Sequence, residues 1–186
     1  MFILDVMKRW LHILTLLPLT ILLWGCPYQS PYSIDKEASQ PIDENLLGKW
    51  AAMVPRPSDD RHPREEPVKI IFEKRTDNEY DVSITGYLDE LRRARLIKED
   101  TIKGTAFLST IENKQFLNAF IYGKVYVAEV RQKENSLDIL TLSEGFTAKF
   151  IKNSESLRNA ITVHYKTRPV PTYDDWFIAK NLQKVN

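Results

Sequence analysis

Side chains that could carry out chemistry are few and scattered in this sequence. His62 and His164 stand in different contexts, and neither has a second histidine or a cysteine at metal-ligand spacing. The acidic pairs at 59–60 and 65–66 could hold Ca²⁺, but the glycine-containing spacing of a calcium loop is missing, so a solvated loop is favoured. Neither a phosphate-binding loop nor a nucleophile elbow occurs. We therefore expect no catalytic residue, metal or cofactor, and no enzyme.

A basic cluster, Arg92, Arg93 and Arg95, lies within residues 88–100, which fit either a helix or a polar strand. The cluster could contact anionic lipid headgroups, although a solvated face is the favoured interpretation. The whole chain has 26 basic and 25 acidic residues. This balance gives no support for nucleic-acid binding, which requires a basic stripe.

The only cysteine, Cys26, follows a segment with the three parts of a secretory signal. Lys8 and Arg9 form a positive start, residues 10–24 are mainly apolar, and the small Gly25 precedes the cysteine. A membrane-spanning helix needs about 20 apolar residues. Only fifteen residues lie between Arg9 and Gly25, and they include Pro18, so a cleaved signal is expected in place of an anchor helix.

The residues Leu23, Trp24, Gly25 and Cys26 resemble the lipobox of bacterial lipoproteins, although Trp24 is bulkier than the residue usual in that position. The resemblance implies that the cysteine thiol carries diacylglycerol with acyl chains such as palmitate, and that the chain is cut just before it. Residues 1–25 are then a signal peptide, and lipid on Cys26 is the link to the membrane. We expect the protein in the bacterial cell envelope, with the outer membrane facing the periplasm favoured over the inner membrane.

Cleavage before Cys26 would leave a formally neutral chain of 161 residues, because it removes Lys8, Arg9 and Asp5. Residues 26–44 contain three prolines and little apolar periodicity, which predicts a lipidated cysteine followed by an extended tether. At ~3.1 Å per residue such a spacer would reach up to ~50 Å. Residues 45–186 are expected to form one domain, which is long enough to bury a core without disulfides.

Short runs of alternating apolar and polar residues fill the middle of this domain, as in strands with one buried face. The runs cover residues 68–72, 80–84, 105–111, 115–122, 124–132 and 136–142. They are joined by short links rich in turn-forming residues, whereas parallel strands need crossovers of about a dozen residues. The pattern predicts a mainly β fold, an antiparallel up-and-down barrel or a strongly curled meander.

A short helix is predicted near the C-terminus, over residues 153–161. Asn153 or Ser154 can cap it, and Leu157 and Ile161 share one face. Residues 173–178, which include Trp176, predict a closing strand.

Gly48 and Trp50, at the start of the first strand, resemble the Gly-x-Trp opening of lipocalins and related calycin barrels. In that family the tryptophan packs across the closed end of the barrel, and a long first loop folds over the mouth. Residues 55–67 stand in the place of that loop. The resemblance therefore implies a lipocalin-like domain, although the sequence shows no clear match near the final strand to the arginine that stacks on the tryptophan.

Two functions follow, and the sequence does not decide between them. The first is a membrane-anchored cell-envelope lipoprotein that binds a small hydrophobic or lipidic ligand inside the barrel. The alternative is an envelope interaction or structural protein whose filled barrel presents loops to a protein partner. The inward set predicted for either function is Trp50, Phe72, Tyr80, Phe107, Phe116 and Tyr126, and all of these except Trp50 are candidate ligand-binding residues.

Overall fold

The computed structural model describes residues 30–55, 65–86, 101–143, 151–167 and 173–185. The signal peptide, Cys26 and the basic cluster at 92–95 lie outside these described residues, as do His62 and most of the predicted mouth loop. The described elements are η1 (Glu44–Leu46), β1 (Gly48–Pro55), β2 (Glu65–Lys74), β3 (Tyr80–Gly86), β4 (Thr101–Ile111), β5 (Lys114–Ile121), β6 (Lys124–Lys133), β7 (Ser136–Leu142), α3 (Ser154–Thr167) and β8 (Tyr173–Val185).

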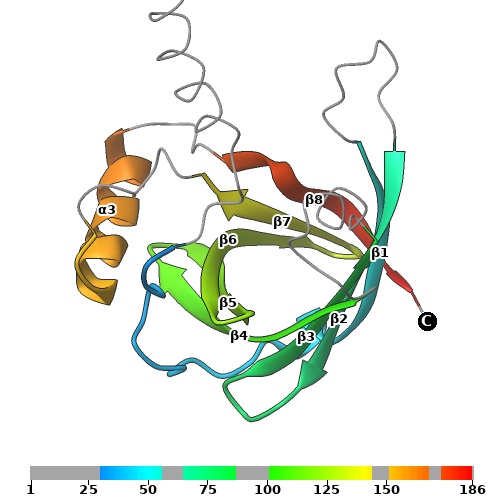
Figure 1. Ribbon diagram of the computed structural model, residues 1–186, viewed down its shortest axis with the longest axis horizontal. Coiled ribbons are helices and arrows are strands. Elements are labelled where there is room, and N and C mark those ends of the chain that lie inside the picture. The colour runs from blue at the N-terminus through cyan, green and yellow to red at the C-terminus, as the bar shows by residue number, and fades with distance from the viewer. Residues whose placement is uncertain (1–29, 56–64, 87–100, 144–150, 168–172, 186) are drawn as a thin grey trace, which may run out of the picture.

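The strands form a closed barrel in which each strand pairs antiparallel with its neighbours in chain order (Figure 1). β1 closes the ring by pairing with β8 through Lys49, Trp50 and Ala51. The up-and-down barrel predicted from the short links is therefore confirmed, as is the helix near the C-terminus. The antiparallel up-and-down barrel is consistent with a lipocalin-like fold.

Successive side chains along each strand point alternately into and out of the barrel, and this separates two apolar clusters. The inner cluster fills the barrel and includes Trp50, Phe72 and Tyr80. The outer cluster lies on the opposite face of β4 to β7, where Leu157 and Ile161 of α3 pack against Phe116. The wall formed by β4, β5 and β6 therefore carries buried apolar side chains on both faces.

α3 begins where the sequence predicts and runs longer than predicted, to Thr167. Asn153 caps it, because its side-chain Oδ1 accepts a hydrogen bond from Ser156 N at 2.8 Å. Leu157 and Ile161 are both fully buried, as their shared face predicts. Among the described residues, no helix has the length and apolar character needed to cross a bilayer.

The prediction that residues 26–44 form an extended tether is wrong for residues 30–43. These residues pack along the outside of the barrel wall. Ser30 N donates to Val125 O at 2.8 Å, and the side chain of Ile34 is buried in the outer cluster. Ile34 N donates to the side-chain Oδ1 of Asn118, which is fully buried on β5. Prolines and polar residues made this segment resemble a spacer, yet its backbone polar groups and one apolar side chain find partners on the wall.

A second contact holds the same segment against α3. Arg158 donates from Nη2 to Asp35 Oδ1 at 2.6 Å and from Nη1 to Thr110 O at 2.8 Å. The described part of the segment is thus a layer of the folded domain.

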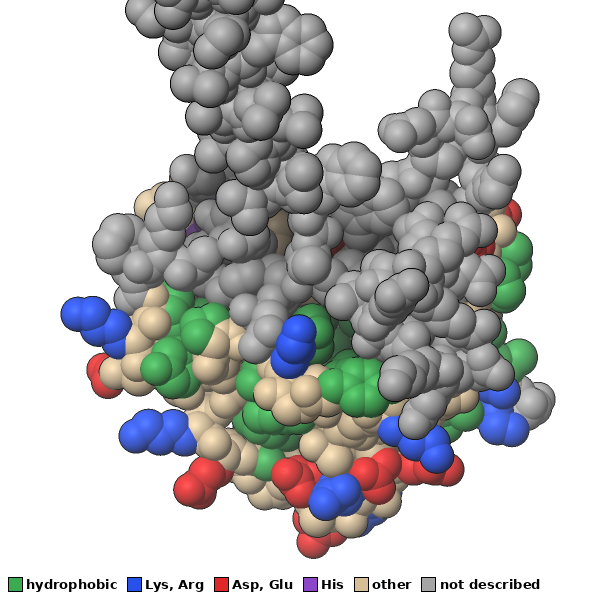
Figure 2. Space-filling view, viewed as in Figure 1, with side chains coloured by type: hydrophobic (Ala, Val, Ile, Leu, Met, Phe, Trp, Pro, Cys, Tyr) green, Lys and Arg blue, Asp and Glu red, His purple; other side chains and the backbone are tan. Residues whose placement is uncertain are grey.

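Figure 2 shows charges of both signs along the lower edge of the visible face, beneath hydrophobic side chains near its middle.

Candidate ligand site in the barrel interior

The order of the strands defines two ends of the barrel. The connections from β1 to β2, β3 to β4, β5 to β6 and β7 to β8 all fall at one end, which we call the mouth. The remaining connections and η1 fall at the other end, which we call the closed end. Pro55, Gly86 and Ile121 are the last residues of their strands at the mouth, whereas Gly48 and Tyr80 begin their strands at the closed end.

Trp50 lies at the closed end, as the resemblance to lipocalins implies. Its side chain is 1% exposed, and its indole Nε1 donates to Leu46 O at 2.8 Å. Lys184, near the end of β8, places its Nζ 5.3 Å from the centre of the indole ring. A cation on the final strand thus lies over the face of the tryptophan. Lys184 Nζ also donates to Asn45 O at 3.1 Å.

Gly48 has a backbone requirement that explains its type. Its φ is +112°, in the region that side chains disfavour, and an added Cβ would lie 3.2 Å from Lys184 Cε. Glycine therefore lets β1 start in this conformation beneath the lysine that covers Trp50.

Phe72 and Tyr80 form a packed floor above the closed end. Their rings meet edge to face with centroids 5.7 Å apart, and both side chains are fully buried together with Leu137 and Leu182. Burial raises the pKa of Tyr80 to about 12. The phenol therefore stays protonated and donates to Asp43 O at 3.1 Å, which ties the chain before η1 across this end.

The interior changes character toward the mouth. Inward positions on β4, β5 and β6 are occupied by Ala106, Ala119 and Ala128, which we call the alanine wall. Small barrels of about eight strands are just wide enough for side chains to fill them. Three small side chains on neighbouring strands therefore leave more interior space than large aliphatic ones would.

Apolar side chains next to the alanine wall are only partly buried. Ile84, Ile121 and Tyr126 pack against the inner cluster near the mouth ends of β3, β5 and β6, yet each remains of intermediate exposure. On β1 and β2 the inward Val54 and Val68 are buried, whereas the inward Ala52 of β1 is only partly buried. The partly accessible apolar side chains of the interior are therefore contributed by β3, β5 and β6 and by Ala52 of β1.

The structure distributes the predicted ligand-binding residues over three places. Phe72 and Tyr80 belong to the floor, and Tyr126 faces the mouth half of the interior. The prediction that Phe107 and Phe116 face inward is wrong. Phe116 packs in the outer cluster beneath α3, and Phe107 stacks on Phe120 with centroids 5.7 Å apart, on the face opposite Ala106 and its neighbours.

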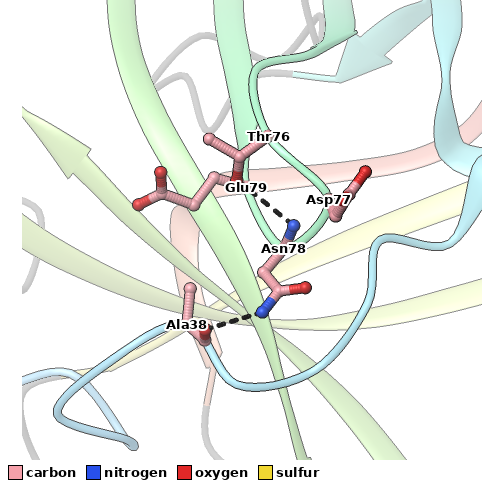
Figure 3. A pocket seen from close by; sticks show the side chains of 5 residues that line it. All are labelled: Ala38, Thr76, Asp77, Asn78 and Glu79. Carbon is pink, nitrogen blue, oxygen red and sulfur yellow. Dashed lines mark hydrogen bonds between the residues drawn. The ribbon is translucent and has the colours of Figure 1, made fainter.

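A separate surface hollow lies outside the barrel at the turn between β2 and β3 (Figure 3). It is lined by Ala38 and by Thr76, Asp77, Asn78 and Glu79 of the turn. Asn78 Nδ2 donates to Ala38 O at 3.0 Å, and Asn78 N donates to Thr76 Oγ1 at 3.2 Å. The hollow is wide open, and its polar groups are used to hold residues 30–43 to the turn, so we regard it as structural.

A buried carboxylate on the outer wall is the strongest electrostatic feature among the described residues. Glu129 is 2% exposed, and its Oε1 accepts from Arg131 Nε at 2.7 Å and from Lys114 Nζ at 3.3 Å. Its Oε2 accepts from the hydroxyls of Tyr165 on α3 and Tyr173 on β8. We call this group the Glu129 network.

Hydrogen bonding decides the protonation state of the Glu129 network. Burial alone raises the pKa of Glu129, but the bonds from Arg131, Tyr165 and Tyr173 outweigh it and lower this pKa to about 2. Burial and the neighbouring carboxylate raise the pKa of both tyrosines, which therefore remain donors. Both carboxylate oxygens are occupied by protein donors, so the network joins α3 and β8 to the wall and offers no acceptor for a substrate.

Comparison of the chain with protein-family models, with curated proteins and with solved structures finds no match. The candidate site therefore rests on the geometry of the barrel itself. Sequence reasoning missed the alanine wall and the half-buried Ile84 and Ile121, because it selected aromatic residues. The sequence did contain a signal for these alanines. Each of them is two residues from a large aliphatic residue on the same strand, and side chains two apart on a strand point to the same face: Ala106 with Leu108, Ala119 with Leu117, and Ala128 with Val130.

Proposed function

We propose that the protein is a cell-envelope lipoprotein, held at the membrane by lipid on Cys26, whose barrel binds a small hydrophobic or lipidic ligand. The observation that carries the ligand proposal is the set of half-buried apolar side chains, Ile84, Ile121 and Tyr126, beside the alanine wall. Apolar surface that faces inward and stays accessible is the lining that hydrophobic ligands require. The closed floor beneath it limits the ligand to the mouth half.

The anchor proposal rests on the sequence before the barrel. Leu23, Gly25 and Cys26 fit the lipobox, and the thiol of Cys26 has no second cysteine with which to form an internal disulfide. One acyl chain binds a bilayer only marginally, whereas two or more chains give stable attachment. An anchored position also brings the barrel close to a supply of hydrophobic molecules.

Two adjacent alanines on β1 give a matched test of the ligand site. Ala52 faces inward against the inner cluster, whereas Ala51 faces the outside of the wall beside the exposed Lys69. We expect Ala52→Phe to fill the accessible interior and to weaken binding of a dansyl-labelled undecanoic acid by about tenfold or more, a loss of ~1.4 kcal/mol. We expect Ala51→Phe to bind like the wild type. Fluorescence titration of residues 27–186 produced without the signal measures both.

The alternative function, a filled barrel that presents loops to a protein partner, predicts a different result. The wild type would not bind the probe, and Ala52→Phe would overpack the interior at a cost of ~1–3 kcal/mol in the free energy of unfolding. The specific observation in favour of this alternative is the tight floor of Phe72, Tyr80 and Leu137. A measured drop in melting temperature without any probe binding would therefore replace the ligand proposal with this one.

A further inference from the structure

We infer that the mouth of the barrel faces the membrane and rests on the lipid surface. The inference rests on the anchor part of the proposed function, namely lipid on Cys26. It adds an orientation that the anchor alone does not give. The surface that the rim of the mouth contacts is accordingly a phospholipid bilayer.

The chain between the anchor and the barrel is short. Cys26 is only four residues before Ser30, and an extended chain spans at most ~3.3–3.6 Å per residue, or about 14 Å in all. Ser30 is fixed, because it is 1% exposed and its backbone N donates to Val125 O at 2.8 Å. An anchor of this length cannot act as a free tether.

Ser30 lies near the mouth of the barrel. Val125 is the second residue of β6, and β6 begins at the mouth just after the turn that contains Tyr122 and Gly123. From Ser30 the chain runs along the wall away from the mouth, since Ile34 N bonds Asn118, which pairs with Val127 further along β6. The lipid on Cys26 is therefore held at the mouth end.

Among the described residues, the rim of the mouth carries exposed apolar side chains. Two of the most exposed large hydrophobic side chains, Tyr122 at 55% and Met53 at 54%, lie near the mouth ends of β5 and β1. Tyrosine has an apolar ring and a polar hydroxyl, which suit the boundary between water and lipid. In this orientation a hydrophobic ligand passes from bilayer to barrel without crossing bulk water.

The test compares two hairpin turns at opposite ends of β6. Tyr122 and Glu134 are both exposed, and both have positive φ, of 50° and 33°, so a cysteine at either position carries a similar backbone cost. β6 has ten residues, so at ~3.3 Å per residue the turns are about 30 Å apart along the strand. The full chain, purified from membranes, is labelled with a fluorophore as Tyr122→Cys or Glu134→Cys. It is then reconstituted in vesicles of phosphatidylethanolamine and phosphatidylglycerol that contain a nitroxide-headgroup lipid.

We expect the label at position 122 to be quenched several-fold more strongly than the label at position 134. A spacer of about twelve glycine and serine residues inserted after Gln29 adds roughly 20 Å of reach and should remove most of that difference. Equal quenching at both positions, or stronger quenching at 134, on vesicle-bound protein overturns the orientation while the anchor stands. Uptake of the thiol label by the wild type, together with failure to float with vesicles, shows instead that Cys26 is not lipidated, and the anchor proposal fails with the inference.

Discussion

Trp50→Ala is expected to lower the free energy of unfolding by ~3–5 kcal/mol, because truncating a buried aromatic side chain removes apolar burial and leaves a cavity. Domains of this size are usually stable by only ~5–15 kcal/mol. The variant also loses the indole that bonds Leu46 O and lies beneath Lys184. Urea denaturation followed by circular dichroism measures the change.

Two further variants test whether the loss comes from the packing of Trp50 or from any substitution on the same strand. Trp50→Phe should recover much of the loss, since it restores an aromatic ring without the Nε1 donor. Met53→Ala lies on the same strand, but its side chain is 54% exposed, so its effect should stay within ~0.5 kcal/mol. Equal and small effects of Trp50→Ala and Met53→Ala would contradict the role of Trp50 in closing the barrel.

The second large effect is expected at Glu129. Glu129→Gln keeps the shape of the side chain but removes the charge that Arg131 and Lys114 neutralise. Breaking a buried ion pair typically costs ~3–5 kcal/mol, and we expect a loss of this size. Glu134→Gln, in an exposed turn, is the matched control and should change stability by no more than ~0.5 kcal/mol.

The Glu129 network also predicts a pH dependence with a definite sign. The folded-state pKa is about 2, below the ordinary 4.5, so the folded state binds fewer protons than the unfolded state between these values. The stabilisation is therefore fully present above pH 4.5 and is lost as the pH falls toward 2. Between pH 7 and pH 3 the loss from this group is roughly 2 kcal/mol.

Glu129→Gln should lack this part of the acid sensitivity, whereas Glu134→Gln should keep it. Urea denaturation of the three proteins at pH 7 and at pH 3 gives the comparison. An identical pH dependence in the wild type and in Glu129→Gln would show that the carboxylate is not held ionised by the network.

The barrel could be predicted from the sequence because the features that specify it, short turns and alternating strands, are visible in short stretches of the chain. Short turns such as Tyr122-Gly123 force antiparallel neighbours, and alternation on β2 and β3 places Phe72, Tyr80 and Val82 on the inner face, as the structure confirms. Because each of these strands has one apolar face, the two-residue alternation of apolar and polar side chains identifies the strand and also shows which face points inward.

The orientation of β4 to β6 could not be predicted in the same way. Ala106, Phe107 and Leu108 are consecutive and all buried, and elsewhere on the outer face of this wall α3 and Ile34 pack against apolar side chains. When both faces are apolar, alternation no longer says which face is inward. The choice of Phe107 and Phe116 as ligand residues failed for this reason.

Two other features depend on contacts between distant parts of the chain. Asn118 stands alone among apolar residues on β5, and its partner Ile34 N is 84 residues away. Lys184 covers Trp50 because β8 continues to Val185, well beyond the predicted closing strand at 173–178. Neither partnership has a local sequence signal, so the layer formed by residues 30–43 and the cation over the tryptophan required the structure.

Native mass spectrometry of the full chain, extracted from its own membranes, tests the proposed function most directly. We predict a chain beginning at Cys26 with covalent acyl mass, together with a noncovalent hydrophobic adduct that Ala52→Phe loses and Ala51→Phe retains. A wild-type chain that carries the covalent lipid but no noncovalent adduct, or an adduct that Ala52→Phe retains in full, would contradict ligand binding inside the barrel.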